Sequence, residues 1–435
     1  MRETEKARLV PAAKGPVRAA VTLPGSKSVT NRALPIAALA HGETLLKGAL
    51  FSDDSRYCIE ALRSLGYGVE TDAGAAAVRV RGRGTEPLMS GRGGDLFVGN
   101  SGTASRFLTA FVALGRGNFR IDGVARMRER PIADLLAALR LWGVDARDEL
   151  GTGCPPVLVR ANGIPGGETV VRGESSSQYA TALLLAAPCA ARESVIAVAG
   201  ELVSAPYVRM TVAMMEDFGV AVETGDRSFR VRPQAYRARE YQIEPDASGA
   251  SYFLAAAAVT GGEVTIAGLS GRMLQGDAAF AGVLERMGCE VARGPRGLTL
   301  RGPAGGLRGI DVDLFDMSDT VPTLAAIAPL ASAPVTIRNV ANVRLKETDR
   351  LRACAAELRK FGVAVEEFAD GLRIEPRAEL RSGVEVETYD DHRMAMSFAV
   401  LGLRAPGTAI RDPGCVAKTF PDFLERFERM LRDVG

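Results

Sequence analysis

Cationic side chains recur at the predicted starts of apolar helices. Lys27 and Arg32 flank one start, Arg106 follows a second, and His392 and Arg393 lie in the first turn of a third. A helix N-terminus is electropositive, so positive charge is disfavoured there. A bound anion would offset that cost, and helix N-termini bind anions readily. The pattern predicts an anionic ligand, although the Ser, Thr, Asp and Gly residues at these starts are also ordinary helix caps.

Two further stretches concentrate positive charge. The sequence VARMRERP at 124–131 carries three arginines, of which Arg126 is the first. The sequence VRLKETDRLR at 343–352 is predicted to form a helical turn that places Lys346 and Arg350 at i, i+4. Like charges at that spacing repel each other unless something negative lies between them. A solvated charged face is the alternative for each stretch alone, but together they favour a small molecule with negative charges.

Two carboxyl residues lie in this basic setting. Asp319 and Glu347 are candidate proton carriers. The chain has no G-x-x-x-x-G-K-[ST] motif and no strand-linked G-x-G-x-x-G, so ATP and NAD have no motif support. The six cysteines form no C-x-x-C pair, and two histidines cannot build a His-rich zinc site, so we expect no metal and no cofactor. The net charge of +2 argues against a dedicated nucleic-acid-binding protein.

A repeat of about 72 residues organises the elements that position these side chains. An Ala- and Leu-rich helix pattern, apolar all round, starts at residues 27, 101, 176, 247, 318 and 390. Amphipathic helix patterns and short strands lie between the copies, and the tail FLERFERMLRDVG looks like a sixth amphipathic pattern that is cut short. A helix that is apolar all round must be buried. We therefore expect six units, divided three plus three, with these helices inside and the strands outside.

The length and the apolar runs bound the overall organisation. A chain of 435 residues predicts two or more domains, and a break is plausible near Pro245. The N-terminal residues contain no apolar signal-peptide core, and the longest apolar stretch, at 181–191, is too short to cross a bilayer. These features predict a cytoplasmic protein with no membrane partner.

Ten sequence motifs resemble the signatures of the 5-enolpyruvylshikimate-3-phosphate synthase family, in register from about residue 21 to 423. They are LPGSKSVTNRAL, SDDSRY, GNSGTASR, RMRERPI, SSSQYATALL, LVSAPY, DASGASYFLAAAA, RLKETDRL, DDHRMAM and AKTFPDF. The resemblance implies an α/β fold, a two-domain inside-out α/β barrel of six βαβαββ units, three per domain, with buried helices. It implies one domain of residues 1–25 and 245–435, a second of residues 26–244, and an active site in the cleft between them.

The resemblance also implies a reaction. A member of this family transfers the enolpyruvyl group of phosphoenolpyruvate to the 5-hydroxyl of shikimate 3-phosphate and releases phosphate, by addition and elimination through a tetrahedral intermediate. The step belongs to the shikimate pathway, which leads to chorismate and the aromatic amino acids. The resemblance further implies a monomer that needs no cofactor, no metal and no nucleic acid. Glyphosate is expected to compete with phosphoenolpyruvate.

Site residues follow from the resemblance position by position. The catalytic residues are expected to be Lys27, Asp319 and Glu347. The residues expected to bind shikimate 3-phosphate are Lys27, Ser28, Arg32, Ser176, Ser177, Gln178, Ser204, Tyr207, Asp319, Asn342 and Lys346. The residues expected to bind phosphoenolpyruvate are Lys27, Asn100, Gly102, Arg126, Gln178, Arg350, Arg393 and Lys418. Gly102 either lets a ligand approach the backbone closely or supplies a turn with positive φ.

Some positions depart from the commonest family pattern, and two other functions compete. Phe107, Ala125 and Asp390 are unusual but remove no expected ligand, and only Phe107 bears on the pose of the helix that carries Gly102. The cell-wall enolpyruvyl transferase that acts on UDP-N-acetylglucosamine shares the fold, but its reactive loop cysteine is missing, because residues 99–153 contain no Cys. A six-unit repeat protein used only for binding would leave the cations at the helix starts unexplained.

Overall fold

The computed structural model describes residues 6–84, 93–174, 176–270 and 273–432, which form two compact units. The continuous unit comprises Gly25–Glu244. The split unit comprises Met1–Pro24 together with Pro245–Gly435. Each unit contains three small sheets, and among the described residues none of the six sheets closes on itself. No helix in the described part of the chain has both the length and the apolarity needed to cross a membrane.

The second repeat of the continuous unit shows the topology that the other repeats share. Two parallel strands are joined by a buried helix, and a second helix leads to an antiparallel hairpin on the same sheet, in the order β6-β7-β9-β8. This is a βαβαββ unit. Its elements are β6 (Gly94–Phe97), α3 (Gly102–Ala113), β7 (Arg116–Asp122), α4 (Ala133–Leu141), β8 (Asp145–Asp148) and β9 (Val157–Asn162).

The other two repeats of the continuous unit follow the same plan. The third is β10 (Gly167–Arg172), α5 (Ser177–Ala186), β11 (Ser194–Ala199), α6 (Ala205–Asp217), β12 (Glu223–Thr224) and β13 (Ser228–Val231). The first is α1 (Lys27–Leu39), β3 (Ala40–Lys47), α2 (Asp53–Ser64), β4 (Gly68–Asp72) and β5 (Ala77–Arg83). Its remaining parallel strand comes from the far end of the unit, as β14 (Tyr236–Arg237) and β15 (Glu240–Gln242), which both pair with β3.

The split unit contains the remaining three repeats, and two of them take a strand from the N-terminal segment. The fourth is β2 (Arg18–Val21), α7 (Ala247–Thr260), β16 (Glu263–Ala267), α8 (Phe280–Arg286), β17 (Glu290–Gly294) and β18 (Gly297–Arg301). The fifth is β19 (Ile310–Asp313), α9 (Val321–Ile327), β20 (Val335–Arg338), α10 (Arg350–Lys360), β21 (Val365–Phe368) and β22 (Gly371–Ile374). The sixth is β23 (Glu385–Val386), α11 (His392–Gly402), β24 (Ala409–Arg411) and α12 (Phe423–Arg432), with β1 (Ala7–Leu9) antiparallel to β24.

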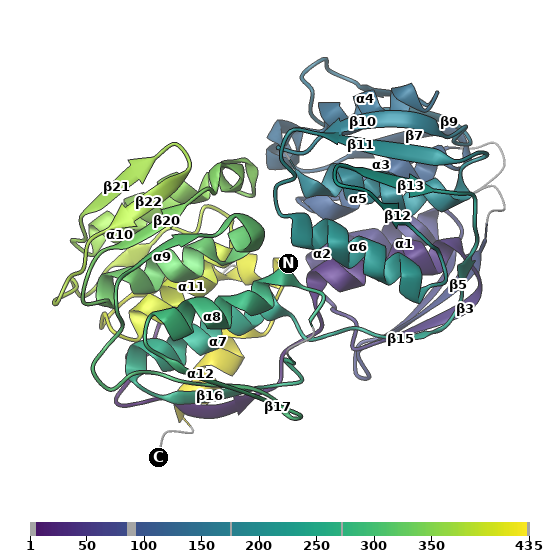
Figure 1. Cartoon of the computed structure of the whole chain (residues 1–435). Coiled ribbons are helices and arrows are strands. Elements are labelled where there is room, and N and C mark those ends of the chain that lie inside the picture. Colours follow the sequence, from purple (N-terminus) through teal and green to yellow (C-terminus); the bar gives the residue numbers. More distant parts are fainter. Residues whose placement is uncertain (1–5, 85–92, 175, 271–272, 433–435) are drawn as a thin grey trace. The chain divides into compact units, whose positions relative to one another are not determined.

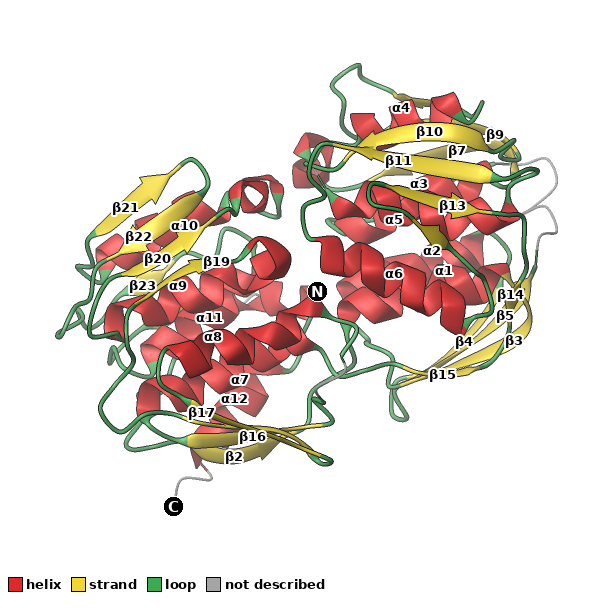
Figure 2. Ribbon diagram, in the orientation of Figure 1, coloured by secondary structure: helices red, strands yellow, loops and turns green. Residues whose placement is uncertain are grey.

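In each unit, the apolar helices lie inside and the strands lie outside, as Figures 1 and 2 show. Every residue of α3 and of α11 is buried, and α1 is buried from Ser28 to Leu39. By contrast, α2 and α12 bury only one face. The expected fold of six βαβαββ units with buried helices is therefore confirmed. The sixth repeat is not simply cut short, since β1 supplies its hairpin strand from the opposite end of the chain.

One local prediction was wrong. The segment 343–352 is not a single helical turn, because a 3₁₀ helix (Ala341–Leu345) ends before Lys346 and α10 begins at Arg350. Lys346 is extended, with φ −84° and ψ −151°. Asp349 caps α10 by accepting a hydrogen bond from the backbone N–H of Arg352 at 3.1 Å. Asp prefers such caps to helix interiors, which explains why the helix begins here.

Candidate active site

Arg350 is the centre of a charged cluster in the split unit. Its side chain is only 1% exposed, at the first position of α10. The guanidinium Nε lies 2.8 Å from Asp391 Oδ2. Its Nη1 lies 3.1 Å from Asp319 Oδ1, and its Nη2 lies 2.7 Å from Glu347 Oε2. Burial lowers the pKa of Arg350, but the three carboxylates raise it by more, so this side chain is a permanent cation.

Asp319 is shared by three cations. Besides Arg350, it contacts Arg393 Nη2 at 2.7 Å through Oδ2 and Lys346 Nζ at 3.8 Å through Oδ1. A short 3₁₀ helix (Phe315–Thr320) before α9 carries it. The negative group that had to lie between Lys346 and Arg350 is therefore a carboxylate of the protein itself. Asp319 keeps these cations close to one another without a ligand.

Glu347 is held between two cations. Its Oε2 contacts Arg350, and its Oε1 lies 3.6 Å from Lys418 Nζ. Lys418 ends the 3₁₀ helix Pro413–Lys418, and both side chains are largely buried. A carboxylate among cations in a buried site can accept a proton from carbon or return it, provided a substrate lies within reach.

Arg393 and Asn342 border the same cluster. Arg393, at the start of α11, also contacts the Tyr252 hydroxyl at 3.4 Å. Burial raises the pKa of Tyr252 to about 12, so this phenol stays protonated. Asn342 donates a hydrogen bond to Ser318 Oγ at 3.2 Å. Six of the predicted site residues form the cluster, namely Asp319, Lys346, Glu347, Arg350, Arg393 and Lys418.

Two acids of this region were missed by the sequence predictions. Asp391 contacts Arg350 and caps α11 by accepting the Arg393 backbone N–H at 2.8 Å. Asp277 is fully buried, and it accepts hydrogen bonds from Ser248 Oγ and, at 3.3 Å, from Gln275 Nε2. Burial, helped by the Asp319 charge, raises the pKa of Asp277 to about 6. Asp391 lies within the motif DDHRMAM, so the sequence contained a signal that could have identified it. No local sequence pattern marks Asp277.

In the continuous unit, Lys27 begins α1 and faces a buried acid. Its Nζ lies 3.6 Å from Asp54 Oδ2 in the first turn of α2. The Lys27 side chain keeps 14% of its exposure, whereas Asp54 keeps 2%. Ser26 caps α1, since its hydroxyl accepts from the Val29 backbone N–H. The cation is thus held at the helix start with its amine still accessible.

Arg32 is buried among neutral acceptors. Its guanidinium donates to Thr211 Oγ1 at 2.9 Å, to the Ser28 carbonyl at 2.9 Å and to the Tyr207 carbonyl at 3.2 Å. It also lies over the rings of Phe107 and Tyr207, at 5.3 and 5.7 Å from their centroids. Burial lowers the pKa of Arg32 to about 10. The unusual Phe107 therefore packs against this cation and leaves α3 regular.

The remaining shikimate-site candidates of this unit begin helices. Ser176 caps α5, and its hydroxyl accepts from the Gln178 backbone N–H at 3.2 Å, next to Ser177. Ser204 caps α6 in the left-handed region, with φ 53°, and is buried. Tyr207 follows in the first turn of α6 and is 9% exposed. The predicted residues of both helices therefore lie at helix N-termini, where the backbone N–H groups favour anions.

The start of α3 is shaped by arginines. Arg130 Nη1 donates to the Asn100 carbonyl at 3.0 Å and to its Oδ1 at 3.3 Å. A Cβ added at Gly102 would lie 2.5 Å from Arg130 Nη2 and 3.0 Å from Arg106 Nη1. Gly102 does not have positive φ, so the turn explanation was wrong, and Gly99, with φ 55°, supplies the turn. A side chain at 102 would therefore require the Arg130 guanidinium to shift.

Two further arginines lie near α3. Arg106 is buried and donates to the Gly102 carbonyl at 3.3 Å and to the Pro131 carbonyl at 2.6 Å. Burial, helped by the nearby Arg130, lowers the pKa of Arg106 to about 10. Arg126 forms a 2.7 Å ion pair with Glu129 on the 3₁₀ helix Ala125–Glu129. Arg106 is thus a core residue that ties α3 to the segment before α4.

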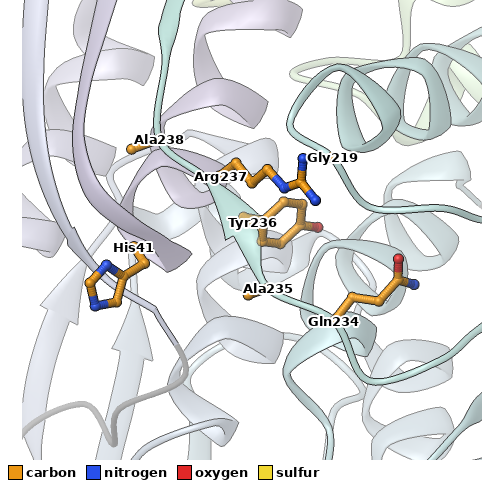
Figure 3. Close-up of a pocket in the computed structure, with 7 residues that line it drawn as sticks. All are labelled: His41, Gly219, Gln234, Ala235, Tyr236, Arg237 and Ala238. Atoms are coloured by element: carbon orange, nitrogen blue, oxygen red, sulfur yellow. The ribbon is translucent and has the colours of Figure 1, made fainter.

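A pocket elsewhere in the continuous unit contains none of the predicted site residues (Figure 3). It measures about 500 Å³, and the ionisable residues that line it are His41, Tyr236 and Arg237. Among the described residues, no group of three or more His, Cys, Asp or Glu side chains could hold a metal ion.

Comparisons with known proteins agree on one family. The family model described as EPSP synthase (3-phosphoshikimate 1-carboxyvinyltransferase) matches residues 11–427. The 3-phosphoshikimate 1-carboxyvinyltransferase of Nostoc punctiforme is 50% identical over 424 residues, which cover 97% of this chain and 98% of that protein. The chloroplastic protein of the same name from Arabidopsis thaliana is 46% identical over 95% of this chain and 82% of its own. The solved EPSP synthase of Acinetobacter baumannii superposes with a TM-score of 0.80 at 26% identity, over 98% of this chain and 97% of that one.

Proposed function

The chain belongs to the EPSP synthase family, and we propose that it transfers the enolpyruvyl group of phosphoenolpyruvate to the 5-hydroxyl of shikimate 3-phosphate. The products are 5-enolpyruvylshikimate 3-phosphate and phosphate. The reaction belongs to the shikimate pathway, which leads to chorismate and the aromatic amino acids. The observation that carries the proposal is the Arg350 cluster, in which four cations and three carboxylates meet at the positions of the family motifs.

We propose that residues of each unit take part in this reaction. The split unit carries the cluster around Arg350, and the continuous unit carries the helix starts of α1, α3, α5 and α6. Two substrates with several negative charges repel each other, so they need cations from more than one element to be brought together. In the cluster, the four cations Lys346, Arg350, Arg393 and Lys418 lie beside the carboxylates Asp319, Glu347 and Asp391.

The chemistry assigns different roles to the two carboxylates. In the addition, the 5-hydroxyl oxygen bonds to C2 of phosphoenolpyruvate and loses its proton, while the methylene carbon gains a proton. In the elimination, that carbon loses a proton and phosphate leaves. We assign the proton transfer at the methylene carbon to Glu347 and contact with the shikimate 5-hydroxyl to Asp319. Lys27 balances negative charge on both substrates. Its ion pair with Asp54, at 3.6 Å, holds the side chain in place before they bind.

An assay of phosphate release tests the proposal. Phosphoenolpyruvate with shikimate 3-phosphate is expected to yield phosphate, whereas phosphoenolpyruvate with UDP-N-acetylglucosamine is expected to yield none. Glu347→Gln is expected to lower kcat by about 10²–10⁴-fold, the usual contribution of a general acid or base. Glu366→Gln on β21 is the matched control, because that carboxylate is exposed. If shikimate 3-phosphate gives no phosphate with the wild-type protein, the proposal fails.

We also propose that the active species is a cytoplasmic monomer. Light scattering during size-exclusion chromatography tests the oligomeric state. An active species of twice the chain mass of 46.0 kDa would contradict it.

A further inference from the structure

Helix α10 contacts the segment before α11 at two places, two turns apart. At its start, Arg350 bonds to Asp391. Seven residues later, on the same face of the helix, Glu357 has a completely buried side chain. Its Oε2 accepts the backbone N–H of Glu387 at 3.0 Å, and its Oε1 accepts the hydroxyl of Tyr389 at 2.7 Å. A buried carboxylate therefore joins α10 to both sides of residue 388.

The segment that Glu357 contacts is strained. Tyr389 and Asp390 both have positive φ, at 54° and 53°, in the left-handed region that non-glycine residues rarely adopt. Asp tolerates this region better than Tyr does, since a bulky side chain is unfavourable there. Two consecutive residues in this conformation persist only where their surroundings hold them. The Tyr389 hydroxyl, fixed by Glu357, is one such restraint.

The strained turn leads directly into the charged cluster. The Asp391 backbone N–H bonds to the Thr388 carbonyl at 2.9 Å, which closes the turn. Asp391 then caps α11 through the Arg393 backbone N–H and bonds to the Arg350 guanidinium. Any shift of residues 388–390 therefore moves the carboxylate that sets the positions of both Arg350 and Arg393.

We propose that Glu357 and Tyr389 are positioning residues for the phosphoenolpyruvate site. They hold the left-handed turn at residues 389–390, and through Asp391 they fix the two arginines that bind the anion. The proposal rests on the proposed function for the identity of that anion. Neither residue touches the reacting atoms. Lys360 Nζ, 2.7 Å from Glu357 Oε2, balances the buried charge from the half-exposed side.

Tyr389→Phe is the main test, because it removes only one hydroxyl, from a side chain that is 38% exposed. We expect the KM for phosphoenolpyruvate to rise about fivefold, which is less than the full effect of one hydrogen bond to a charged group because the hydroxyl acts on the site only through Asp391. The KM for shikimate 3-phosphate should change less than about twofold. Glu357→Gln retains an acceptor for the Glu387 N–H and is expected to show a smaller rise. The matched control is Tyr67→Phe, since the buried Tyr67 hydroxyl has no hydrogen-bond partner among the described residues.

Hydrogen exchange separates positioning from general stability. In Tyr389→Phe, the amides of residues 391–395 are expected to exchange faster, with the rest of α10 and α11 unchanged. A variant with a lower Tm but wild-type KM values and wild-type exchange at 391–395 overturns the proposal. If the wild-type protein releases no phosphate, the proposed function fails, and the exchange of residues 391–395 then decides the positioning role alone.

Discussion

Replacing Arg350 by Met would leave three carboxylates without their shared cation. Asp319, Glu347 and Asp391 lie 2.7–3.1 Å from the guanidinium, and each is 13% exposed or less. Breaking a buried ion pair by removing one partner costs about 3–5 kcal/mol, because the other charge stays buried. Arg393 and Lys418 still neutralise Asp319 and Glu347 in part, so we expect a loss near the lower end, about 3 kcal/mol.

Arg344 offers a matched comparison on the same fold. Its guanidinium also bridges two carboxylates, Asp349 at 2.7 Å and Glu367 at 2.8 Å. These three side chains are 24–34% exposed, so solvent screens the pairs. Exposed pairs contribute about 0–1 kcal/mol. Arg344 also donates to the Ala369 carbonyl at 2.9 Å and to the Phe368 carbonyl at 2.6 Å, so the loss in Arg344→Met includes these two hydrogen bonds. We still expect that loss to be smaller than the loss in Arg350→Met.

Urea unfolding of both variants measures this difference. The loss in Arg350→Met should shrink as the pH falls from 8 to 5, because protonation removes the charge that the buried carboxylates otherwise carry unpaired. The loss in Arg344→Met should change little over the same range. Equal losses in the two variants, or a pH-independent loss in Arg350→Met, would refute the reasoning that buried uncompensated charge dominates.

Three other changes test the site. Lys27→Met should keep its circular dichroism spectrum but retain less than about a tenth of the wild-type kcat/KM, since a charge-assisted contact contributes roughly 1.5–3 kcal/mol; greater residual activity contradicts its role. Gly102→Ala places a methyl 2.5 Å from Arg130 Nη2, so glyphosate inhibition should weaken more than phosphoenolpyruvate binding, and inhibition curves showing equal weakening would exclude a ligand approach at this backbone. Because burial raises the pKa of Asp277 to about 6, the folded protein binds a proton that the unfolded chain has released, and stability falls as the pH rises from about 4 to 6. Asp277→Asn should remove that fall in urea titrations, and an unchanged slope would show that another group causes it.

Local sequence patterns predicted the fold because buried helices require apolar residues at regular positions in the sequence. α11 is apolar all round and buried in full, and His392 and Arg393 lie in its first turn, as expected. The repeat spacing marked all six such helices. Strand partners were not predictable in the same way. β1 pairs with β24, and nothing in the composition of a three-residue strand specifies a partner about 400 residues away.

The sequence predicted which residues belong to the candidate site, but it did not predict the contacts between them. Lys346 and Arg350 were expected on one helix, but the capping preference of Asp349 ends that regularity, and Asp319 separates their charges instead. Asp277 carries no local signal, because its neighbours in space, Ser248 and Asp319, come from other elements. Contacts made across elements depend on tertiary packing, which a local pattern does not encode.

The pairing of β1 and β2 with strands of the split unit has a consequence for synthesis on the ribosome. The continuous unit can fold as soon as residues 25–244 have emerged. β1 must wait for β24, about 400 residues later, which at roughly 5–20 residues per second corresponds to about 20–80 s of translation. β2 waits for β16, about 240 residues later. Until those partner strands are synthesised, β1 and β2 cannot form their sheets. The split unit, which contains Arg350, therefore completes its sheets last.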